Sequence, residues 1–297
     1  MPEGPVKIAV GTSSATTIQS VGTKRRYTLH GLTGSDFPSL PQPEETAPRF
    51  ELSVATLSTL FARTHFSISS DETRPYLNSA MFECTDGLVR MVTTDGHRLS
   101  KMEVTVEGLT AETTMLIPHK AVQELRKLLD EVQDNRDECM VKIAQTGPNA
   151  FFEINSVQFS VKLIDAQFPP YDAVIPAASN RAVRTPRRQL SDALRAVSLA
   201  ASNRTGGVKL AVSENALRIT SESPESGNGF DEVAVEYDGP EMSVGFNARY
   251  LLDVLSAMDA EDEVTLGLSG ELDPAVLRPA PSDSNDDYIA VVMPMRI

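Results

Sequence analysis

The chain ends in Tyr288-Ile289-Ala290-Val291-Val292-Met293-Pro294-Met295-Arg296-Ile297, an almost unbroken apolar run. Termini that stay in water are usually polar, so this run predicts a C-terminus docked on the rest of the protein. Its Val- and Ile-rich first half is typical of a β-strand, which Pro294 ends because proline has no N–H to donate. The Met-rich end predicts an adaptable surface for binding partners; the alternative is a last strand with an ordinary tail.

Length and charge limit the class of protein. The chain has 297 residues, enough for two or three domains with proper cores. Its 27 Lys and Arg against 41 Asp and Glu give a net charge of −14. Because duplex binding needs positive charge near the phosphates, any DNA contact must be confined to a surface where basic residues cluster, such as the inner wall of a protein that encircles DNA. Two cysteines are too few for a disulfide framework, and no apolar run approaches the roughly 20 residues of a membrane span. We therefore expect a cytoplasmic protein without membrane association.

The sequence also repeats itself. Val6-Lys7-Ile8-Ala9 recurs as Val141-Lys142-Ile143-Ala144, and each copy leads, roughly thirty residues on, to Phe-Pro. A degenerate third copy runs from Val264 to Met293-Pro294. The repeats predict structurally similar domains along the chain.

Hydrophobic periodicity predicts the elements ahead of the second and third repeat ends. The predicted helices are 54–66, 118–130, 186–201 and 247–258, and the predicted strands are 81–83, 88–93, 101–107, 208–212, 216–221 and 232–237. Segments 221–232 and 279–287 are expected to be solvated loops. The first repeat has no predicted elements upstream of its closing strands. The pattern therefore predicts that residues 1–46 form only a two-stranded remnant of a domain, and a two-stranded sheet has marginal stability on its own. The fold class is α+β.

Four ordered landmarks resemble one family. They are Arg74-Pro75-Tyr76-Leu77-Asn78, Thr93-Thr94-Asp95-Gly96-His97-Arg98-Leu99, Phe168-Pro169-Pro170-Tyr171 and Val291-Val292-Met293-Pro294-Met295-Arg296-Ile297. They are similar to landmarks of the bacterial DNA polymerase III beta subunits, the beta sliding clamps. The resemblance implies a DNA-clamp fold of repeated two-helix, antiparallel-sheet domains: a C-terminal remnant of the first domain at 1–46, a complete middle domain at 47–178 and a complete third domain at 179–297.

The resemblance further implies a processivity factor that tethers the replicative DNA polymerase III to duplex DNA, without catalysis or cofactor. Short linear motifs of the DNA polymerase III alpha subunit, the clamp loader, other polymerases and repair proteins would dock in a hydrophobic cleft between the second and third domains. Alternatively, some of these residues cement the domain interface. Ala173 departs from the family, which often has a basic residue there. Carried over by position, the cleft comprises Tyr76, Leu77, Thr94, Gly96, His97, Arg98, Leu99, Pro169, Val174, Asn247, Tyr250, Val291, Val292, Met293, Pro294, Met295 and Arg296.

Basic residues recur at seven-residue spacing on two predicted helices, so each pair shares a helix face. Surface helices commonly carry such cations, so solvated faces are the alternative. The resemblance implies pore-lining helices that contact the phosphates of an encircled duplex without reading sequence. His119 stands where the family commonly has a cation. The predicted DNA-facing residues are Lys120, Lys127, Arg188 and Arg195, with Arg63, Arg74 and Arg204 at helix ends and adjoining loops.

Asp95 and His97 raise an alternative, an acid–base pair of an enzyme. Asp-Gly between apolar runs is a turn signal, and neighbours across a tight turn rarely point at one reacting atom. No second carboxylate, nucleophile elbow, phosphate loop or metal-ligand spacing accompanies the pair. We expect neither catalysis nor a metal site.

The resemblance also implies a homodimeric ring, closed edge to edge. One side would use Tyr27 and Leu29, and the partner protomer Ser198 and Leu199, with Glu222 or Glu225 facing Lys24 or Arg25. Because a two-stranded remnant is marginal alone, we expect residues 1–46 to be loosely held and the dimer to be weakened or lost. Two functions follow as alternatives: a working clamp, or a ring-incompetent truncated clamp that only binds partner motifs.

Overall fold

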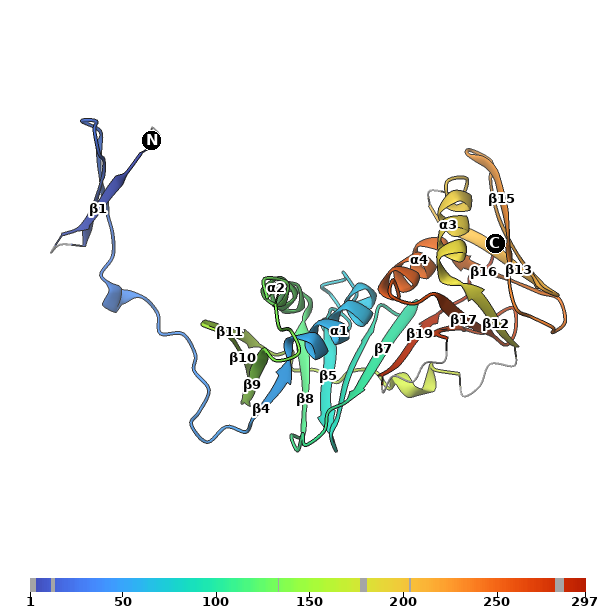
Figure 1. Cartoon of the computed structure of the whole chain (residues 1–297), viewed down its shortest axis with the longest axis horizontal. Helices are drawn as coiled ribbons and strands as arrows, with labels where there is room; N and C mark the ends of the chain where they lie inside the picture. Colours follow the sequence, from blue (N-terminus) through green and yellow to red (C-terminus); the bar gives the residue numbers. More distant parts are fainter. Residues whose placement is uncertain (1–3, 12–13, 133, 177–180, 203, 281–285) are drawn as a thin grey trace. The chain divides into compact units, whose positions relative to one another are not determined.

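The chain folds into two units, Met1–Gln42 and Pro43–Ile297, each with its own internal contacts. In this computed structural model the described residues are 4–11, 14–132, 134–176, 181–202, 204–280 and 286–297 (Figure 1). The predicted boundary at 178/179 and most of the predicted 279–287 loop lie outside them, so the division into a second and third domain stays a prediction. None of the helices in these ranges is long and apolar enough to span a membrane.

The N-terminal unit contains a three-stranded antiparallel sheet, so the expectation of a two-stranded remnant was wrong. Its strands, in the order β1-β2-β3, are β1 (Val6–Val10), β2 (Ala15–Ser20) and β3 (Arg26–His30), followed by the short 3-10 helix η1 (Gly34–Asp36). The additional strand is β2, whose Thr16, Thr17 and Ile18 are β-branched residues that favour strands. The register places Ile8, Ile18 and Tyr27 side by side on one face, and Ile8 remains 66% exposed. This face is therefore uncovered within the unit.

Two four-stranded antiparallel sheets belong to the C-terminal unit. The first, in the order β11-β10-β9-β4, contains β4 (Arg49–Ser53), β9 (Met140–Thr146), β10 (Asn149–Ile154) and β11 (Val157–Lys162). The second, in the order β15-β14-β13-β16, contains β13 (Gly207–Ser213), β14 (Ala216–Ser223), β15 (Gly227–Ala234) and β16 (Met242–Asn247). The expected loop at 221–232 is therefore wrong, because most of it lies in the β14–β15 hairpin, where Thr220 pairs with Phe230.

A central sheet of eight strands contains elements from both halves of this unit. Its order is β12-β17-β18-β19-β7-β6-β5-β8, with β5 (Ser79–Thr85), β6 (Leu88–Thr94), β7 (Arg98–Thr105), β8 (Thr113–Pro118), β12 (Arg181–Pro186), β17 (Glu263–Leu268), β18 (Ala275–Pro279) and β19 (Asp286–Val292). The C-terminal strand β19 pairs with β18 on one side and β7 on the other. Val291 lies opposite Leu99, so the last strand joins the two halves.

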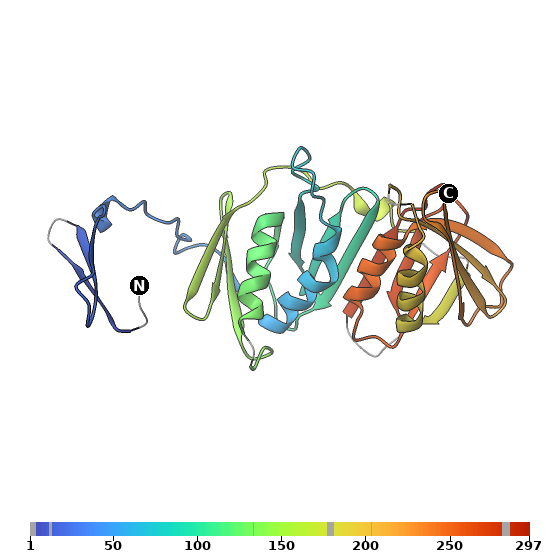
Figure 2. The ribbon, with the colours of Figure 1, turned by 90° about the horizontal axis from the view of Figure 1, so that it is seen from above.

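Four α-helices form within the described ranges, all in the C-terminal unit, where they lie on one side of its sheets (Figure 2). Ser53 caps the first helix by accepting a bond from the Thr56 N–H, and Asn247 caps the last by accepting one from Arg249. Their apolar stripes pack into one core with the sheets. The bounds match the predicted helices closely: α1 (Val54–Thr64, continued by the 3-10 turn η2, His65–Ser67), α2 (His119–Asp130), α3 (Arg187–Ser198) and α4 (Ala248–Ala257).

The residues after β19 are docked on the protein, as the apolar run predicts. The Met293 N–H donates to the His97 carbonyl over 2.9 Å, and the Met295 N–H donates to the Gly245 carbonyl over 2.8 Å. A Cβ atom added to Gly245 would lie 2.5 Å from the Met295 oxygen and 2.6 Å from Ile297 Cγ1. Glycine at this position thus permits the close approach of the tail.

We predict that Gly245→Ala displaces the tail and lowers the free energy of unfolding by about 1–3 kcal/mol, since the added methyl overpacks this contact. Urea unfolding and the rate of carboxypeptidase digestion of residues 293–297 measure the two effects. Gly34→Ala is the control, because an added Cβ there meets nothing within 4 Å. Equal stability and equal digestion of the two variants would contradict the role given to Gly245.

Candidate functional site

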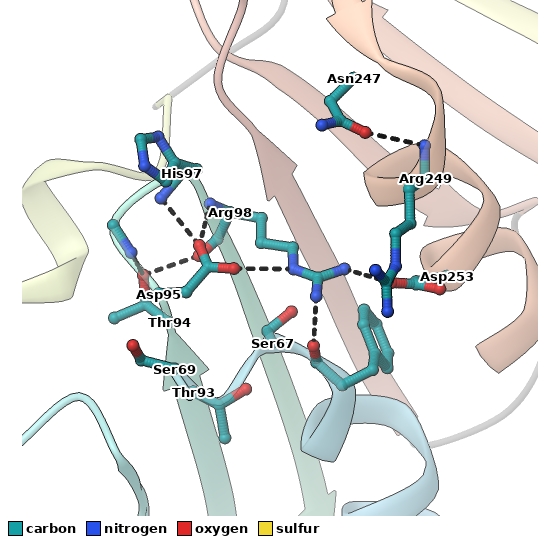
Figure 3. A network of polar contacts seen from close by, with 12 residues as sticks. Ser67, Ser69, Thr93, Thr94, Asp95, His97, Arg98, Asn247, Arg249 and Asp253 are labelled. Atoms are coloured by element: carbon teal, nitrogen blue, oxygen red, sulfur yellow. Dashed lines mark hydrogen bonds and ion pairs between the residues drawn. The ribbon is translucent and has the colours of Figure 1, made fainter. Parts of the chain in front are cut away.

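The turn between β6 and β7 is built by its own polar side chains (Figure 3). The Asp95 carboxylate accepts hydrogen bonds from the N–H groups of His97 and Arg98, at 2.8 and 3.0 Å. The Thr94 hydroxyl donates to the Arg98 carbonyl over 2.7 Å, and Gly96 takes a positive φ of 91°. Asp95 therefore shapes the turn, as the Asp-Gly signal indicates.

Arg98 fixes this turn to helix α4. Its Nε lies 3.0 Å from Asp95 Oδ2, its Nη1 lies 2.6 Å from Asp253 Oδ2, and its Nη2 donates to the Phe66 carbonyl (Figure 3). The guanidinium also lies 4.6 Å from the centroid of the Tyr250 ring. The Arg98 side chain is only 9% exposed. Its charge is thus committed to internal contacts, beneath the surface that a partner would touch.

An aromatic wall and the tail border the turn on its accessible side. The rings of His97 and Tyr250 stack with their centroids 6.4 Å apart. Burial, together with the Asp95 carboxylate, raises the pKa of the Tyr250 phenol, which keeps its proton available as a donor. His97 and Met293 are exposed, and the Met293 N–H is bonded to the His97 carbonyl. The turn, α4 and the tail thus meet at one place.

The predicted cleft residues fall into layers by burial. Those that are accessible are Gly96, His97, Val174, Met293 and Arg296, and those that are half-buried are Tyr76, Thr94, Arg98, Pro169, Asn247, Tyr250, Pro294 and Met295. Those that are buried are Leu77, Leu99, Val291 and Val292, which support the surface from below. Leu99 and Val291 share a small apolar cluster against which Phe168 and Tyr171 pack. Within the described residues, Tyr76 and Pro169 form no hydrogen bond or ring contact with the turn or tail.

Sequence reasoning missed two residues of this site, Asp253 and Phe66, which hold Arg98. Asp253 carried a weak signal, because it lies three residues after Tyr250 and therefore on the same helix face. Phe66 carried none, because it contributes its backbone carbonyl and a ring 5.5 Å from the Arg98 guanidinium.

The predicted DNA-facing residues differ in accessibility. Arg63 is held inside, with its side chain 14% exposed, 2.9 Å from Glu261 and over the Tyr288 ring. The others are exposed: Arg74, Lys120, Lys127, Arg188, Arg195 and Arg204.

Several of these exposed cations have carboxylate neighbours: Lys120 with Glu72, Lys127 with Glu124, Arg195 with Asp192 and Arg74 with Asp71. Hydrogen bonds from Thr73 and Arg74 lower the pKa of Asp71 to about 2. Exposed ion pairs contribute little stability, so these carboxylates do not fix the cations firmly in place.

Three of the four predicted dimer residues are accessible, and Ser198 is half-buried. Tyr27 and Leu29 are each 53% exposed on β3, and Leu199, just after α3, is 84% exposed. The Ser198 hydroxyl donates to the Arg195 carbonyl. Phe230, on edge strand β15, is 66% exposed and was not predicted from the sequence.

Two family models match the chain: the central domain of the DNA polymerase III beta subunit over residues 51–170, and its C-terminal domain over residues 172–296. The beta sliding clamp of Salmonella typhimurium is 32% identical over 297 residues, 100% of this chain and 78% of that protein. The beta sliding clamp of Pseudomonas aeruginosa is 33% identical over 275 residues, 92% of this chain and 72% of that protein.

Solved structures agree with this match. The DNA polymerase III subunit beta of Pseudomonas aeruginosa superposes with a TM-score of 0.87 at 30% identity, covering 98% of this chain and 77% of that one. The sliding clamp of Bartonella birtlesii bound to griselimycin superposes with a TM-score of 0.87 at 33% identity, covering 99% and 78%.

We predict that Arg98→Ala lowers the free energy of unfolding by about 2–3 kcal/mol, because Asp253 and Asp95 lose a largely buried charge partner. Urea unfolding measures the change. Arg249→Ala is the control, since its side chain is 84% exposed at 4.0 Å from the same Asp253 carboxylate, and should stay within about 0.5 kcal/mol of the parent protein. Similar losses in both variants would rule out the special role of Arg98.

Proposed function

The chain belongs to the DNA polymerase III beta subunit family, the beta sliding clamps, and from that premise we propose which of its surfaces hold partner motifs, duplex DNA and a second protomer. As a DNA sliding clamp it is a non-catalytic processivity factor, which tethers the polymerase to DNA. Its relatives are named as clamps, which favours a working clamp over a module that only binds partner motifs. The observation that carries the proposal is the β19–β7 pairing, which brings the 94–99 turn and the C-terminal tail together.

Partner motifs dock where the tail, the turn and α4 meet. Exposed Met293 offers a flexible apolar contact, the His97–Tyr250 stack forms a wall, and buried Leu99 and Val291 give a rigid floor. Such a surface suits a short motif of a polymerase, clamp loader or repair protein, whose Leu or Phe anchor gains about 1.5–3 kcal/mol on burial. The sliding clamps of Pseudomonas aeruginosa and Bartonella birtlesii bind griselimycin, which is therefore a suitable competitor.

Duplex DNA contacts the helical side of the protein. The cations Lys120 and Lys127 on α2, and Arg188 and Arg195 on α3, all belong to helices on one side of the sheets (Figure 2). Arg74 and Arg204, which are exposed residues outside the helices and strands, would add further positive charge. Contacts of this kind bind phosphates and are blind to sequence, which permits sliding. Arg63 is left out, because its guanidinium is engaged with Glu261.

A second protomer pairs through sheet edges. Strand β3 is an edge of its sheet and β15 is an edge of another, so β3 of one protomer can extend β15 of its partner. The contact would bury Tyr27, Leu29, Leu199 and Phe230, and set Lys24 and Arg25 against acidic residues such as Glu222 and Glu225. Because the apolar face of the β1-β2-β3 sheet is uncovered within its unit, this edge is weakly supported and the dimer weakened.

We predict that Met293→Asp weakens binding of a short peptide with a Leu or Phe anchor at least about tenfold, because a carboxylate replaces apolar contact area. Fluorescence anisotropy with a labelled peptide, with griselimycin as competitor, measures the affinity. Leu272→Asp is the control, since Leu272 is 67% exposed in the β17–β18 connection. Equal affinities of the two variants would place the docking site elsewhere.

We predict that light scattering across a concentration series shows a mass that rises from monomer toward dimer. Phe230→Glu removes the rise, because it places a charge in the proposed edge contact, whereas Val157→Glu, on edge strand β11, leaves it unchanged. A monomer at every concentration would refute the interface, and a stable dimer at low micromolar concentration would refute its weakening.

A further inference from the structure

A cavity of about 280 Å³ lies between helices α1 and α2, away from the proposed cleft. Helix α1 lines it with Ser58, Thr59 and Ala62, and helix α2 lines it with Arg126, Leu129 and Asp130. Arg136, from the segment after α2, completes the wall. We refer to it as the Arg126–Arg136 pocket. It combines two guanidinium groups and two hydroxyls, which together offer many hydrogen-bond donors in a small space.

Arg136 is held in place from both its backbone and its side chain. Its carbonyl accepts a bond from the Ala55 N–H at the start of α1, over 3.1 Å. Its Nη2 donates to the Ser58 hydroxyl over 2.5 Å, and the same nitrogen lies 4.0 Å from Asp130. The Arg136 side chain is 33% exposed, so its remaining donors can reach a bound group.

Arg126 approaches from the α2 side. Its side chain is half-buried, and among the described residues it forms no hydrogen bond or ion pair. Burial lowers the pKa of His65, and the nearby charge of Arg126 lowers it further, so the positive field reaches the α1 side. Asp130, the one carboxylate lining the pocket, is 71% exposed and points its charge largely to solvent. Two positive charges against one negative leave the pocket positive, in a protein with a net charge of −14.

We propose that the Arg126–Arg136 pocket binds a phosphate group. Guanidinium groups bind phosphate oxygens through paired, charge-assisted hydrogen bonds, and the Ser58 and Thr59 hydroxyls supply further donors. The phosphate comes either from a DNA backbone or from free phosphate. The backbone is the favoured source, since α1 and α2 lie on the helical side that faces DNA in the proposed function, on which this choice of source rests (Figure 2).

Titration with inorganic phosphate tests the pocket without DNA. Arginine side-chain NMR signals should shift with saturation in the parent protein, and Arg126→Gln should weaken the affinity roughly tenfold by removing one charge-assisted contact. Arg136→Gln tests the opposite wall in the same way. Arg218→Gln is the control, because Arg218 is 57% exposed on β14 and pairs with Glu232. The proposal fails if no saturation is seen, or if Arg126→Gln and Arg218→Gln bind phosphate alike while their thermal unfolding midpoints match the parent.

Duplex binding across a salt series then identifies the source. If one DNA phosphate occupies the pocket, the doubly substituted Arg126→Gln, Arg136→Gln protein should lose about 0.9 from the slope of log affinity against log salt, and Arg218→Gln should lose nothing. An unchanged slope, with phosphate binding lost, overturns the DNA source and leaves free phosphate as the ligand. A parent protein that binds phosphate but no DNA contradicts the proposed function while leaving the pocket intact.

Discussion

The pairing of β19 with β7 is the interaction on which the rest of the C-terminal unit depends. Seven register pairs, from Asp286 opposite Val104 to Val292 opposite Arg98, join the last strand of the chain to a strand formed almost two hundred residues earlier. Without this pairing, the eight-stranded sheet would separate into two four-stranded parts, one on each side of the β19–β7 junction. Because a one-residue slip would turn every buried side chain of β19 to the opposite face, the register also fixes where the Met-rich tail emerges.

Arg98, whose side chain is only 9% exposed, makes this junction specific as well as stable. Removing a guanidinium from water is costly, and the cost is offset only because Asp95, Asp253 and the Phe66 carbonyl accept its hydrogen bonds. These acceptors come from three separate elements, so they coincide only when turn, η2 and α4 are correctly placed. Apolar packing alone would tolerate small displacements of α4 over the sheet, whereas a charge with fixed acceptors does not. Arg98 connects the turn that carries His97 to the helix that carries Tyr250. The same contacts therefore fix the stacking of these two rings.

Local sequence patterns predicted the helices and most strands. The pairing of the 221–232 hairpin and the burial of individual side chains depend on long-range contacts, which local patterns do not reveal. The apolar stripe of residues 54–66 specifies a helix by its spacing alone, and α1 with η2 fills that range. The 221–232 hairpin was missed because its Ser, Gly and acidic residues are typical of loops, although Leu217 and Val233 pair beside it in the core. Arg63 and Lys120 could not be distinguished by sequence either, since Arg63 is drawn inward by Glu261, 198 residues away. The cleft residues stay a prediction, and which of them are accessible depends on packing, which the sequence does not show.

The charge distribution explains how an acidic protein can stay on DNA through contacts weak enough to permit sliding. A net charge of −14 repels a duplex from most of the surface, so in the proposed function attraction is confined to exposed cations such as those of helices α2 and α3. Several of these cations already have carboxylate neighbours, as Lys127 does in Glu124, so a phosphate contact made by one of them would replace an existing ion pair and yield only a small gain. Small, interchangeable gains leave low barriers between neighbouring positions on the duplex. A phosphate held in the Arg126–Arg136 pocket, where two guanidinium groups converge, would be the exception. Releasing that phosphate would raise the barrier to sliding at one contact, while the other contacts keep their low barriers.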